Sequence, residues 1–310
     1  MTREDMKKWK RELGYTNEDI ARLSGVPLGT VQKIFAGVTK APRRQTIEAI
    51  REVLDGEEAW EKRRRLHDEA VLRDALARID RQKAAQPETL REAPIEYQAG
   101  TAARPLAETP SPFFFGSGEG PRPDTVGPYT IEDYCALPDT PRVELIDGWF
   151  FVMEAPSATH QRVLVDMMAQ LVPCVEAHPE CELFVAPFDV RLDAFTEDKT
   201  MVQPDLLITC SGKVDDERLN GPPDLAVEIT SPSSRRHDMR RKLHKYMDAG
   251  VREYWVVDPA REKVLVWRLE EDDVTTYTFD DTVPVHISDG ACSVDFARIR
   301  QKLARAAGNS

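Results

Sequence analysis

The chain has 310 residues, 41% of them hydrophobic and 31% charged, which is typical of a globular protein with room for two domains and their connections. Its net charge of −12 argues against a protein that coats a nucleic-acid backbone over its whole surface. No apolar run reaches the ~18–20 residues of a membrane helix, and the charged N-terminus lacks the apolar core of a signal peptide. We therefore expect a cytoplasmic protein with no membrane partner.

The cysteines show neither CxxC spacing nor clustering with histidine. This pattern argues against a zinc site and against a disulfide framework. We expect reduced, mostly buried thiols at all five positions, which are Cys135, Cys174, Cys181, Cys210 and Cys292.

Residues 1–56 are expected to form a small all-α domain with helices over residues 2–13, 16–24, 27–35 and 46–54. Thr2 and Thr16 are suited to cap the first two helices, and Asp19 follows Thr16 by three residues, as in a capping box. Pro27 fits the first turn of the third helix, where its missing N–H is harmless, and Gly37 fits the end of that helix.

Residues 57–85 are highly charged but carry apolar residues at roughly helical spacing, which predicts a helical spacer. Two interpretations stay open: the helix pairs with a copy of itself, or it is solvated. Residues 86–128 contain eight prolines, which predicts an extended, disordered linker. Within it, Phe113-Phe114-Phe115 fits either docking onto a domain or partner subunit, or a locally collapsed patch.

Residues 129–300 alternate between predicted strands and helices, which indicates an α/β (α+β) domain with a mixed sheet. Asp147-Gly148 stands between two β-rich runs and is a strong hairpin signal. Helices are expected over residues 131–137, 157–178 and 235–249. Further strands are expected over residues 182–192, 201–210, 223–230 and 253–258, with a late hairpin over 263–270 and 275–280.

Two of these strands place a carboxylate among apolar residues. Asp205 lies in the run Gln-Pro-Asp-Leu-Leu, and Glu228 lies in the run Leu-Ala-Val-Glu-Ile. Buried carboxylates are costly unless they are paired, protonated or bound to a metal. On adjacent strands the two side chains would point to one face and share a cation, and such oxygen-rich sites suit Mg²⁺ or Mn²⁺.

A stripe of polar residues is predicted on the helix that follows Glu228. Asp238, Lys242 and Tyr246 recur at intervals of four residues, so they share one helix face, which can point toward the end of the strand. Cleavage of a phosphodiester needs a metal to activate water and a cation to stabilise the crowded phosphorus. Lys242 is the natural candidate for that cation.

The run over residues 223–259 resembles the signature of the Uma-type family of restriction-endonuclease-like proteins. In that signature Glu-x-x-Ser-Pro-Ser is followed by Asp238, Lys242 and Tyr246, then by Gly-Val and Glu-Tyr-Trp. The upstream run over residues 143–148, His160 and the Pro204-Asp205 pair fit the pattern as well. The resemblance spans residues 129–297.

This resemblance implies a PD-(D/E)xK restriction-endonuclease-like fold. Asp205 matches the aspartate of the motif, Glu228 its second acid, and Glu144 the upstream glutamate that completes the metal site. Thr230 stands where the general motif has lysine, and Lys242 on the following helix takes that place. The implied catalytic residues are Glu144, Asp205, Glu228 and Lys242, the first three as metal ligands, with His160, Asp238 and Tyr246 as supporting neighbours.

Each of these residues also has a purely structural interpretation. Asp205 can belong to a strand-entry turn, Glu228 can pair with an arginine, and Glu144 can be an exposed hairpin residue. For the supporting neighbours the alternatives are ion pairing and packing, and His160 fits a positioning role better than a catalytic one.

The N-terminal domain resembles the Cro and lambda-repressor type of helix-turn-helix, through residues 13–16, 20–26, 30–31, 34 and 37. Residues 1–55 carry a net charge of +3 and the remainder −15, which agrees with DNA contact at this end. The resemblance implies bases facing Leu28, Gly29, Thr30, Gln32 and Lys33, and phosphates facing Lys40, Arg43 and Arg44. Leu28 and Gly29 are poor hydrogen bonders, which argues against sharp specificity. The alternative is a helical bundle for protein contacts.

Together these patterns predict a metal-dependent endonuclease that hydrolyses phosphodiester bonds of DNA with Mg²⁺ or Mn²⁺ and is targeted by its N-terminal domain. A homodimer is expected, because such domains read paired half-sites and a double-strand break needs two active sites. The main alternative is a non-catalytic DNA-binding transcriptional regulator whose nuclease-like fold serves dimerisation or sensing. The acidic charge of the C-terminal domain favours it. A component of a mobile-element or defence system is a third hypothesis.

Overall fold

The first two helices begin at the capping residues that the sequence predicts, as a computed structural model shows. Thr2 and Thr16 each cap a helix, with capping boxes completed by Asp5 and Asp19. The third helix ends at Gly37, which has a left-handed backbone (φ 79°). The four helices are α1 (Arg3–Glu12), α2 (Asn17–Ser24), α3 (Leu28–Ala36) and α4 (Arg44–Asp55). The predicted all-α domain is confirmed, with α4 starting two residues earlier than expected.

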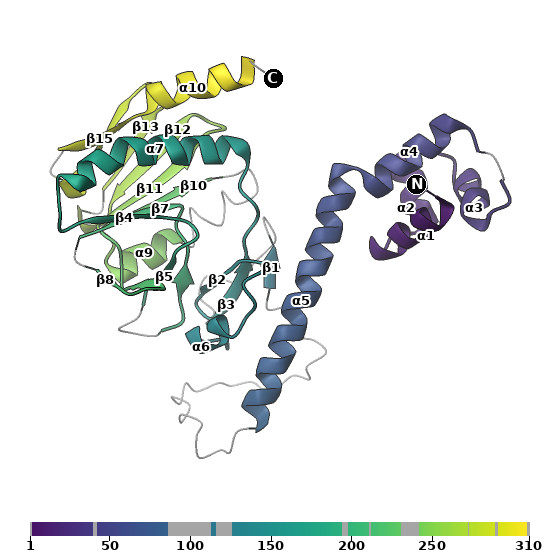
Figure 1. The fold of residues 1–310 in the computed structure, drawn as a ribbon, viewed down its shortest axis with the longest axis horizontal. Helices are drawn as coiled ribbons and strands as arrows, with labels where there is room; N and C mark the ends of the chain where they lie inside the picture. Colours follow the sequence, from purple (N-terminus) through teal and green to yellow (C-terminus); the bar gives the residue numbers. More distant parts are fainter. Residues whose placement is uncertain are drawn as a thin grey trace. The chain divides into compact units, whose positions relative to one another are not determined.

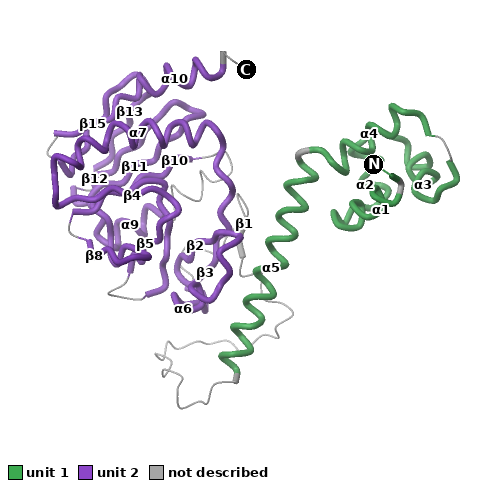
Figure 2. The backbone as a smooth tube through the Cα atoms, in the orientation of Figure 1, with its two compact units in different colours: residues 1–91 green, residues 92–310 purple. Residues whose placement is uncertain are grey.

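The structure describes residues 2–39, 42–85, 113–115, 126–193, 198–210, 212–230, 242–271, 273–288 and 291–308. The chain folds into two compact units, Met1–Arg91 and Glu92–Ser310 (Figure 2). The finer predicted boundaries, at residues 56, 85, 128 and 300, stay predictions. Over the described ranges, no helix is both long and apolar enough to cross a membrane.

The first unit has one apolar core, built from Ile20 of α2, Val31 and Ile34 of α3, and Ile50 and Leu54 of α4. The long helix α5 (Glu57–Ala85) begins against this core. Its residue Ala59 is buried in the core, and the guanidinium of Arg63 lies 4.4 Å from the ring centre of Trp9. The predicted helical spacer is thus a helix, and its pairing with a second copy stays a prediction.

Most of the predicted linker lies outside the described residues, but the Phe113–Phe115 run is a strand, β1. It pairs in parallel with β3 (Trp149–Val152), so that Phe114 is opposite Phe151. Of the two interpretations of this run, docking onto a domain is the one that the structure shows.

The strands of the second unit form two main sheets and a two-stranded ribbon among the described residues (Figure 1). The first sheet has the order β1-β3-β2-β6-β5-β9-β8, with β2 (Val143–Ile146), β5 (Asp189–Arg191), β6 (Met201–Val202), β8 (Lys213–Val214) and β9 (Arg218–Asn220). The second has the order β13-β12-β11-β10-β7-β4, with β4 (Glu182–Val185), β7 (Leu206–Thr209), β10 (Leu225–Ile229), β11 (Glu253–Asp258), β12 (Lys263–Arg268) and β13 (Asp273–Thr278). The ribbon pairs β14 (Thr282–Val285) with β15 (Cys292–Asp295).

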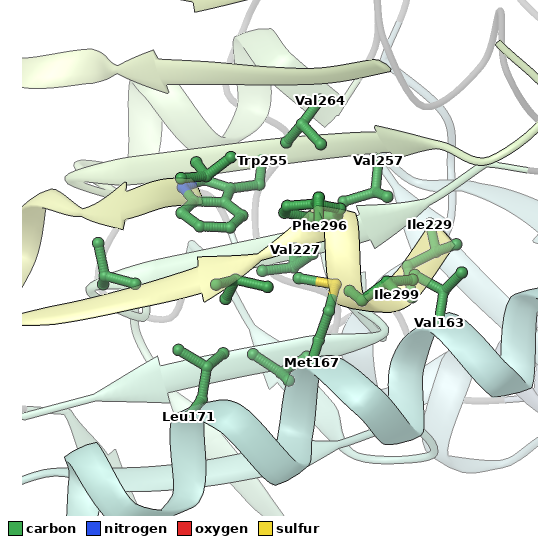
Figure 3. Packing of buried hydrophobic residues seen from close by; sticks show 14 of the residues in the cluster. Val163, Met167, Leu171, Val227, Ile229, Trp255, Val257, Val264, Phe296 and Ile299 are labelled. Carbon is green, nitrogen blue, oxygen red and sulfur yellow. The ribbon is translucent and has the colours of Figure 1, made fainter. Parts of the chain in front are cut away.

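Four helices with described bounds accompany these sheets: α6 (Ile131–Cys135), α7 (Ala158–Glu176), α9 (Leu243–Ala249) and α10 (Phe296–Gly308). One face of the second sheet packs against α7 and α10, where Val227 and Trp255 meet Met167 and Phe296 (Figure 3). Its other face forms a separate core with the first sheet and α9. Strand alternation therefore decides which layer each side chain of β7 and β10 enters.

The predicted hairpins are confirmed. Asp147 and Gly148 both have positive φ (52° and 73°), as a two-residue turn of type I′ requires, and β2 pairs with β3 across them. The late hairpin is the β12–β13 pair. The division into two sheets and the C-terminal ribbon were not predicted, because strands of two to four residues are too short to show an alternating pattern.

The prediction of reduced thiols is wrong for four of the five cysteines. Cys174 of α7 forms a disulfide with Cys292 of β15, and Cys181 forms one with Cys210. These partners are 118 and 29 residues apart in the sequence, so the absence of short-range spacing motifs says nothing about them. Cys135 is exposed and unpaired with another cysteine.

Candidate active site and nucleic-acid interface

The strand register brings Asp205 and Glu228 to the same layer. β7 and β10 pair with Leu207 opposite Ala226, so Asp205, immediately before β7, lies opposite Glu228. Leu207 and Ala226 belong to the core between the second sheet, the first sheet and α9. Because side chains alternate along a strand, Asp205 and Glu228 point to that same layer. The prediction that the two carboxylates share one face agrees with this placement.

Glu144 enters the same layer from the first sheet. It lies on β2 two residues before Ile146, which is part of the same core, so both side chains point inward. Glu144 is only 4% exposed, which excludes the alternative of an exposed hairpin residue. Its Oε1 accepts the backbone N–H of Gln203 at 2.7 Å. Gln203 follows β6, at the point where the chain passes from the first sheet to the second.

The ammonium of Lys242 lies between two carboxylates. Its Nζ is 2.8 Å from Glu144 Oε1 and 2.7 Å from Glu228 Oε1. All three side chains are buried, with Lys242 2% and Glu228 5% exposed. Tyr246, one helical turn after Lys242, donates its hydroxyl to the same Glu228 oxygen at 3.0 Å. The predicted helical stripe therefore faces Glu228, while its first member, Asp238, lies outside the described residues.

Asp205 is held through a single oxygen. Its Oδ2 accepts the backbone N–H of Ile229 at 2.7 Å and lies 3.0 Å from His160 Nε2. Within the described residues, no hydrogen bond or ion pair to its Oδ1 is found. His160 Nδ1 is buried and has no hydrogen-bond partner within the described ranges. His160 thus contacts a predicted metal ligand directly, in agreement with a positioning role.

A polar cluster behind Glu144 was not predicted. The hydroxyl of Tyr134 donates to Asp189 Oδ1 at 2.8 Å, and Gln203 Nε2 donates to the same oxygen at 2.8 Å. Burial and the adjacent Asp189 carboxylate raise the pKa of Tyr134 above its usual value, so the hydroxyl stays protonated. The cluster fixes Gln203, whose backbone in turn holds Glu144. The one weak sign of this polar cluster in the sequence is Gln203, a glutamine in an apolar run.

A second ion pair joins α9 to the hairpin that carries Glu144. Lys245 of α9 contacts Asp147 in the β2–β3 turn. The turn itself is packed against the segment before α6, where Gly127 donates its N–H to the Asp147 carbonyl. Two ion pairs, Lys242–Glu144 and Lys245–Asp147, therefore join this helix to the β2–β3 hairpin.

The donor set agrees in kind with a hard divalent cation, since the carboxylates of Glu144, Asp205 and Glu228 point into one layer. However, no three His, Cys, Asp or Glu side chains within the described ranges lie close enough together to bind one metal ion. The cation between Glu144 and Glu228 is Lys242.

In the N-terminal unit, α3 presents the face that the helix-turn-helix resemblance assigns to DNA. Val31, Ile34 and Phe35 are buried, whereas Gln32 and Lys33 are exposed. Leu28 and Gly29 are exposed, and Thr30 is half-buried. The predicted phosphate contacts Arg43 and Arg44 are exposed at the start of α4, and Lys40 lies outside the described residues.

The first turns of α3 and α4 border one surface hollow of about 580 Å³, lined in part by Pro27, Thr30, Arg43 and Thr46. Neither helix has a side-chain cap on its first N–H groups, unlike α1 and α2 with their capping boxes. Uncapped helix N-termini offer N–H donors and a positive dipole end to an anion. The hollow is therefore suited to phosphate groups.

Comparison with known proteins gives results for both units. The model of the Uma2 family, described as "Putative restriction endonuclease", matches residues 131–291, more than half of the chain, and a helix-turn-helix model matches residues 6–60. A solved structure of a "putative nuclease belonging to DUF820" from Anabaena variabilis ATCC 29413 is 18% identical, with a TM-score of 0.47 over 56% of this chain and 99% of that one. No curated protein matches. The chain belongs to the Uma2 family of restriction-endonuclease-like proteins and carries a helix-turn-helix domain ahead of the family domain.

Proposed function

We propose that the chain is a DNA endonuclease that depends on Mg²⁺ or Mn²⁺ and is targeted by its helix-turn-helix domain. One observation carries the proposal: Glu144, Asp205, Glu228 and Lys242 come from four separate elements and enter a single layer. Burying Glu144, Glu228 and Lys242 beside a half-buried Asp205 is expensive, so a fold that does so has a use for them.

Glu144, Asp205 and Glu228 would hold the metal through their carboxylate oxygens. The chemistry that such a bound ion supplies is activation of water and neutralisation of phosphate charge. Each carboxylate has one oxygen fixed by a protein donor: the N–H of Gln203, the N–H of Ile229 and the hydroxyl of Tyr246. Ligands that are fixed in advance lose less entropy on binding.

Lys242 would orient the attacking water or stabilise the charge that develops on the phosphate. Its ammonium is the cation that the layer supplies, and its position is set by contacts with two carboxylates. His160 would orient Asp205 through Nε2, 3.0 Å from Oδ2. Asp205 keeps its second oxygen without a partner among the described residues, as a ligand needs.

The helix-turn-helix domain would bring the nuclease domain to DNA. Its α3 presents Gln32 and Lys33 outward, and the hollow at the starts of α3 and α4 would receive backbone phosphates. A homodimer fits both domains, because paired half-sites and double-strand cleavage each require two copies. Light scattering on the purified chain would determine whether it dimerises.

The experiment is plasmid cleavage with Mg²⁺ or Mn²⁺, comparing the wild type with Asp205→Asn and Glu228→Gln. Loss of a metal ligand should lower the cleavage rate by at least about 100-fold. Glu180→Gln is the matched control, because Glu180 is 60% exposed and distant in sequence from these ligands. Equal cleavage by all four proteins would point to a contaminating nuclease and remove the proposal.

The alternative of a non-catalytic regulator is favoured by one observation. An ammonium, and not a group of three ligands from the described residues, occupies the space between Glu144 and Glu228. Such a site would hold the two sheets together without metal. Titration with Mn²⁺ separates the two functions, because a purely structural site binds no Mn²⁺ in an Asp205-dependent way.

A further inference from the structure

Two buried glutamates from different sheets share the positive charge of Lys242. Glu144 and Glu228 are 4% and 5% exposed, and the ammonium is within 2.8 Å of an oxygen of each. A charged carboxylate in such a layer is costly unless a cation compensates its charge. The two negative charges therefore favour a cation in the space between the glutamates, and the ammonium of Lys242 fills that space.

The neutral contacts of the two glutamates do not depend on the ammonium. Glu144 Oε1 is also held by the Gln203 N–H at 2.7 Å, and Glu228 Oε1 by the Tyr246 hydroxyl at 3.0 Å. Both carboxylates would thus stay in place if the ammonium withdrew. They would then face each other without the lysine charge between them, which is an arrangement that attracts a divalent ion.

Residues other than Lys242 also hold α9 against the site. Lys242 directly precedes α9, has helical backbone angles (φ −64°, ψ −37°), and carries a buried side chain. Lys245 and Tyr246 of the same helix have their own contacts, with Asp147 and Glu228. The helix can therefore stay docked while the Lys242 side chain changes its position.

From these contacts we infer that Lys242 and the divalent ion compete for the carboxylates of Glu144 and Glu228. This inference rests on the proposed function and adds a regulatory step to it. Without metal, the lysine closes the site and stabilises the layer. Once the ion binds, the lysine side chain is released and becomes available to a phosphate group. The catalytic cation would thus be freed only when the metal is present.

Calorimetric titration of the full chain with Mn²⁺ provides the first test. Lys242→Met removes the competing charge and should bind Mn²⁺ at least about tenfold more tightly than the wild type, which corresponds to about 1.4 kcal/mol. Lys302→Met removes the same charge from α10, which packs on the opposite face of the second sheet, and its affinity should stay within about twofold of wild type. An equal or weaker affinity in Lys242→Met overturns the inference.

Acetylation of the wild-type chain by an amine-reactive ester, read by peptide mass spectrometry, provides the second test and needs no variant. Lys242 is 2% exposed and should be protected without metal, then become reactive when Mn²⁺ is added. Lys245, with a side chain 25% exposed, should react alike in both states. A lysine that acts only through its charge would give a different result. Lys242→Met would then bind Mn²⁺ more tightly, but Mn²⁺ would not make Lys242 of the wild type reactive. That result would show that the metal does not displace the lysine side chain.

The two proposals fail in different ways. If wild type binds Mn²⁺ and Asp205→Asn does not, while Lys242 stays protected throughout, the metal site stands and the competition does not. If neither the wild type nor Lys242→Met binds Mn²⁺, the metal site of the proposed function fails as well. Binding by Lys242→Met alone would support competition and indicate that the lysine keeps the wild-type site closed.

Discussion

Tyr246 donates its hydroxyl to Glu228 Oε1 at 3.0 Å, the same oxygen that contacts the ammonium of Lys242. Tyr246 is fully buried, and its ring lies 4.8 Å from that of Tyr254 on β11. The hydroxyl therefore joins α9 to the centre of the second sheet through a charged acceptor. Hydrogen bonds of this kind are stronger than neutral ones, because the charge on the acceptor increases the attraction.

Replacing Tyr246 with phenylalanine keeps the ring and removes this hydrogen bond. We expect the free energy of unfolding to fall by about 1.5–3 kcal/mol, the range for a bond to a charged group. Urea denaturation of the purified variant measures it. Tyr277→Phe is the control, because the Tyr277 hydroxyl makes no hydrogen bond that the described residues show. Equal midpoints for Tyr246→Phe and wild type would mean that the contact does not stabilise the fold.

The turn between β2 and β3 has no room for a side chain at Gly148. A Cβ there would lie 2.5 Å from the backbone oxygen of Gly127, and the residue has φ +73°. Gly250 has a similar backbone (φ +86°), but a Cβ added to it would meet no described atom within 4 Å, so it is the matched control. Gly250→Ala should cost about 1–2 kcal/mol from its backbone alone.

Gly148→Ala should cost clearly more than Gly250→Ala, because the clash with Gly127 adds to the backbone term. The excess should also loosen the hairpin that carries Glu144. Thermal unfolding of both variants gives the comparison, and amide exchange of β2 and β3 reports the loosening. Equal losses of stability in the two variants would show that the segment at Gly127 moves aside without cost.

The positions of the charged residues in the site were predictable because strands and helices have fixed periods. Asp205 and Glu228 each stand in an apolar run, and strand alternation is enough to turn them to one layer. Lys242 and Tyr246 are four residues apart, which places them on one helix face. Glu144 was assigned by family resemblance, and the hairpin signal at Asp147 placed it on a strand.

The features that the sequence did not predict depend on contacts between distant segments. Tyr134 and Asp189 meet Gln203 from positions 69 and 14 residues away, and nothing in their local patterns marks them as partners. Cys174 and Cys292 are paired across 118 residues for the same reason. The family resemblance placed Lys242 in one site with Glu144 and Glu228, but its direct ion pairs with both could not be read from local patterns, because β2 and β10 belong to different sheets.

Glu253 is buried on the opposite face of the second sheet, where it accepts bonds from Trp255 Nε1 at 2.7 Å and the Ile287 N–H at 3.0 Å. Burial raises its pKa above the ordinary value of 4.5, and the hydrogen bonds only partly oppose this. An acid whose pKa is raised by folding stabilises the fold below its unfolded pKa. That contribution is lost as the pH rises through the folded pKa.

Glu253→Gln removes this titration. The free energy of unfolding of the wild type, measured relative to the variant, should therefore fall as the pH rises from about 4 toward neutrality, and then level off. Urea denaturation at a series of pH values measures the difference. If Glu253 titrated equally in the folded and unfolded states, the difference in free energy of unfolding between the two proteins would be the same at every pH. A difference that grows with pH would show that the hydrogen bonds outweigh burial.

The hollow at the starts of α3 and α4 leads to a prediction about salt dependence. If Arg43 contacts a phosphate there, Arg43→Ala should weaken binding to DNA duplexes of any sequence and lower the slope of log affinity against log salt by about one. Fluorescence anisotropy of the full chain over a range of KCl concentrations measures both. Arg73→Ala on α5 removes the same charge from an exposed site paired with Glu69, and should leave the slope unchanged. Equal slopes for wild type and Arg43→Ala would place the DNA backbone elsewhere on this domain.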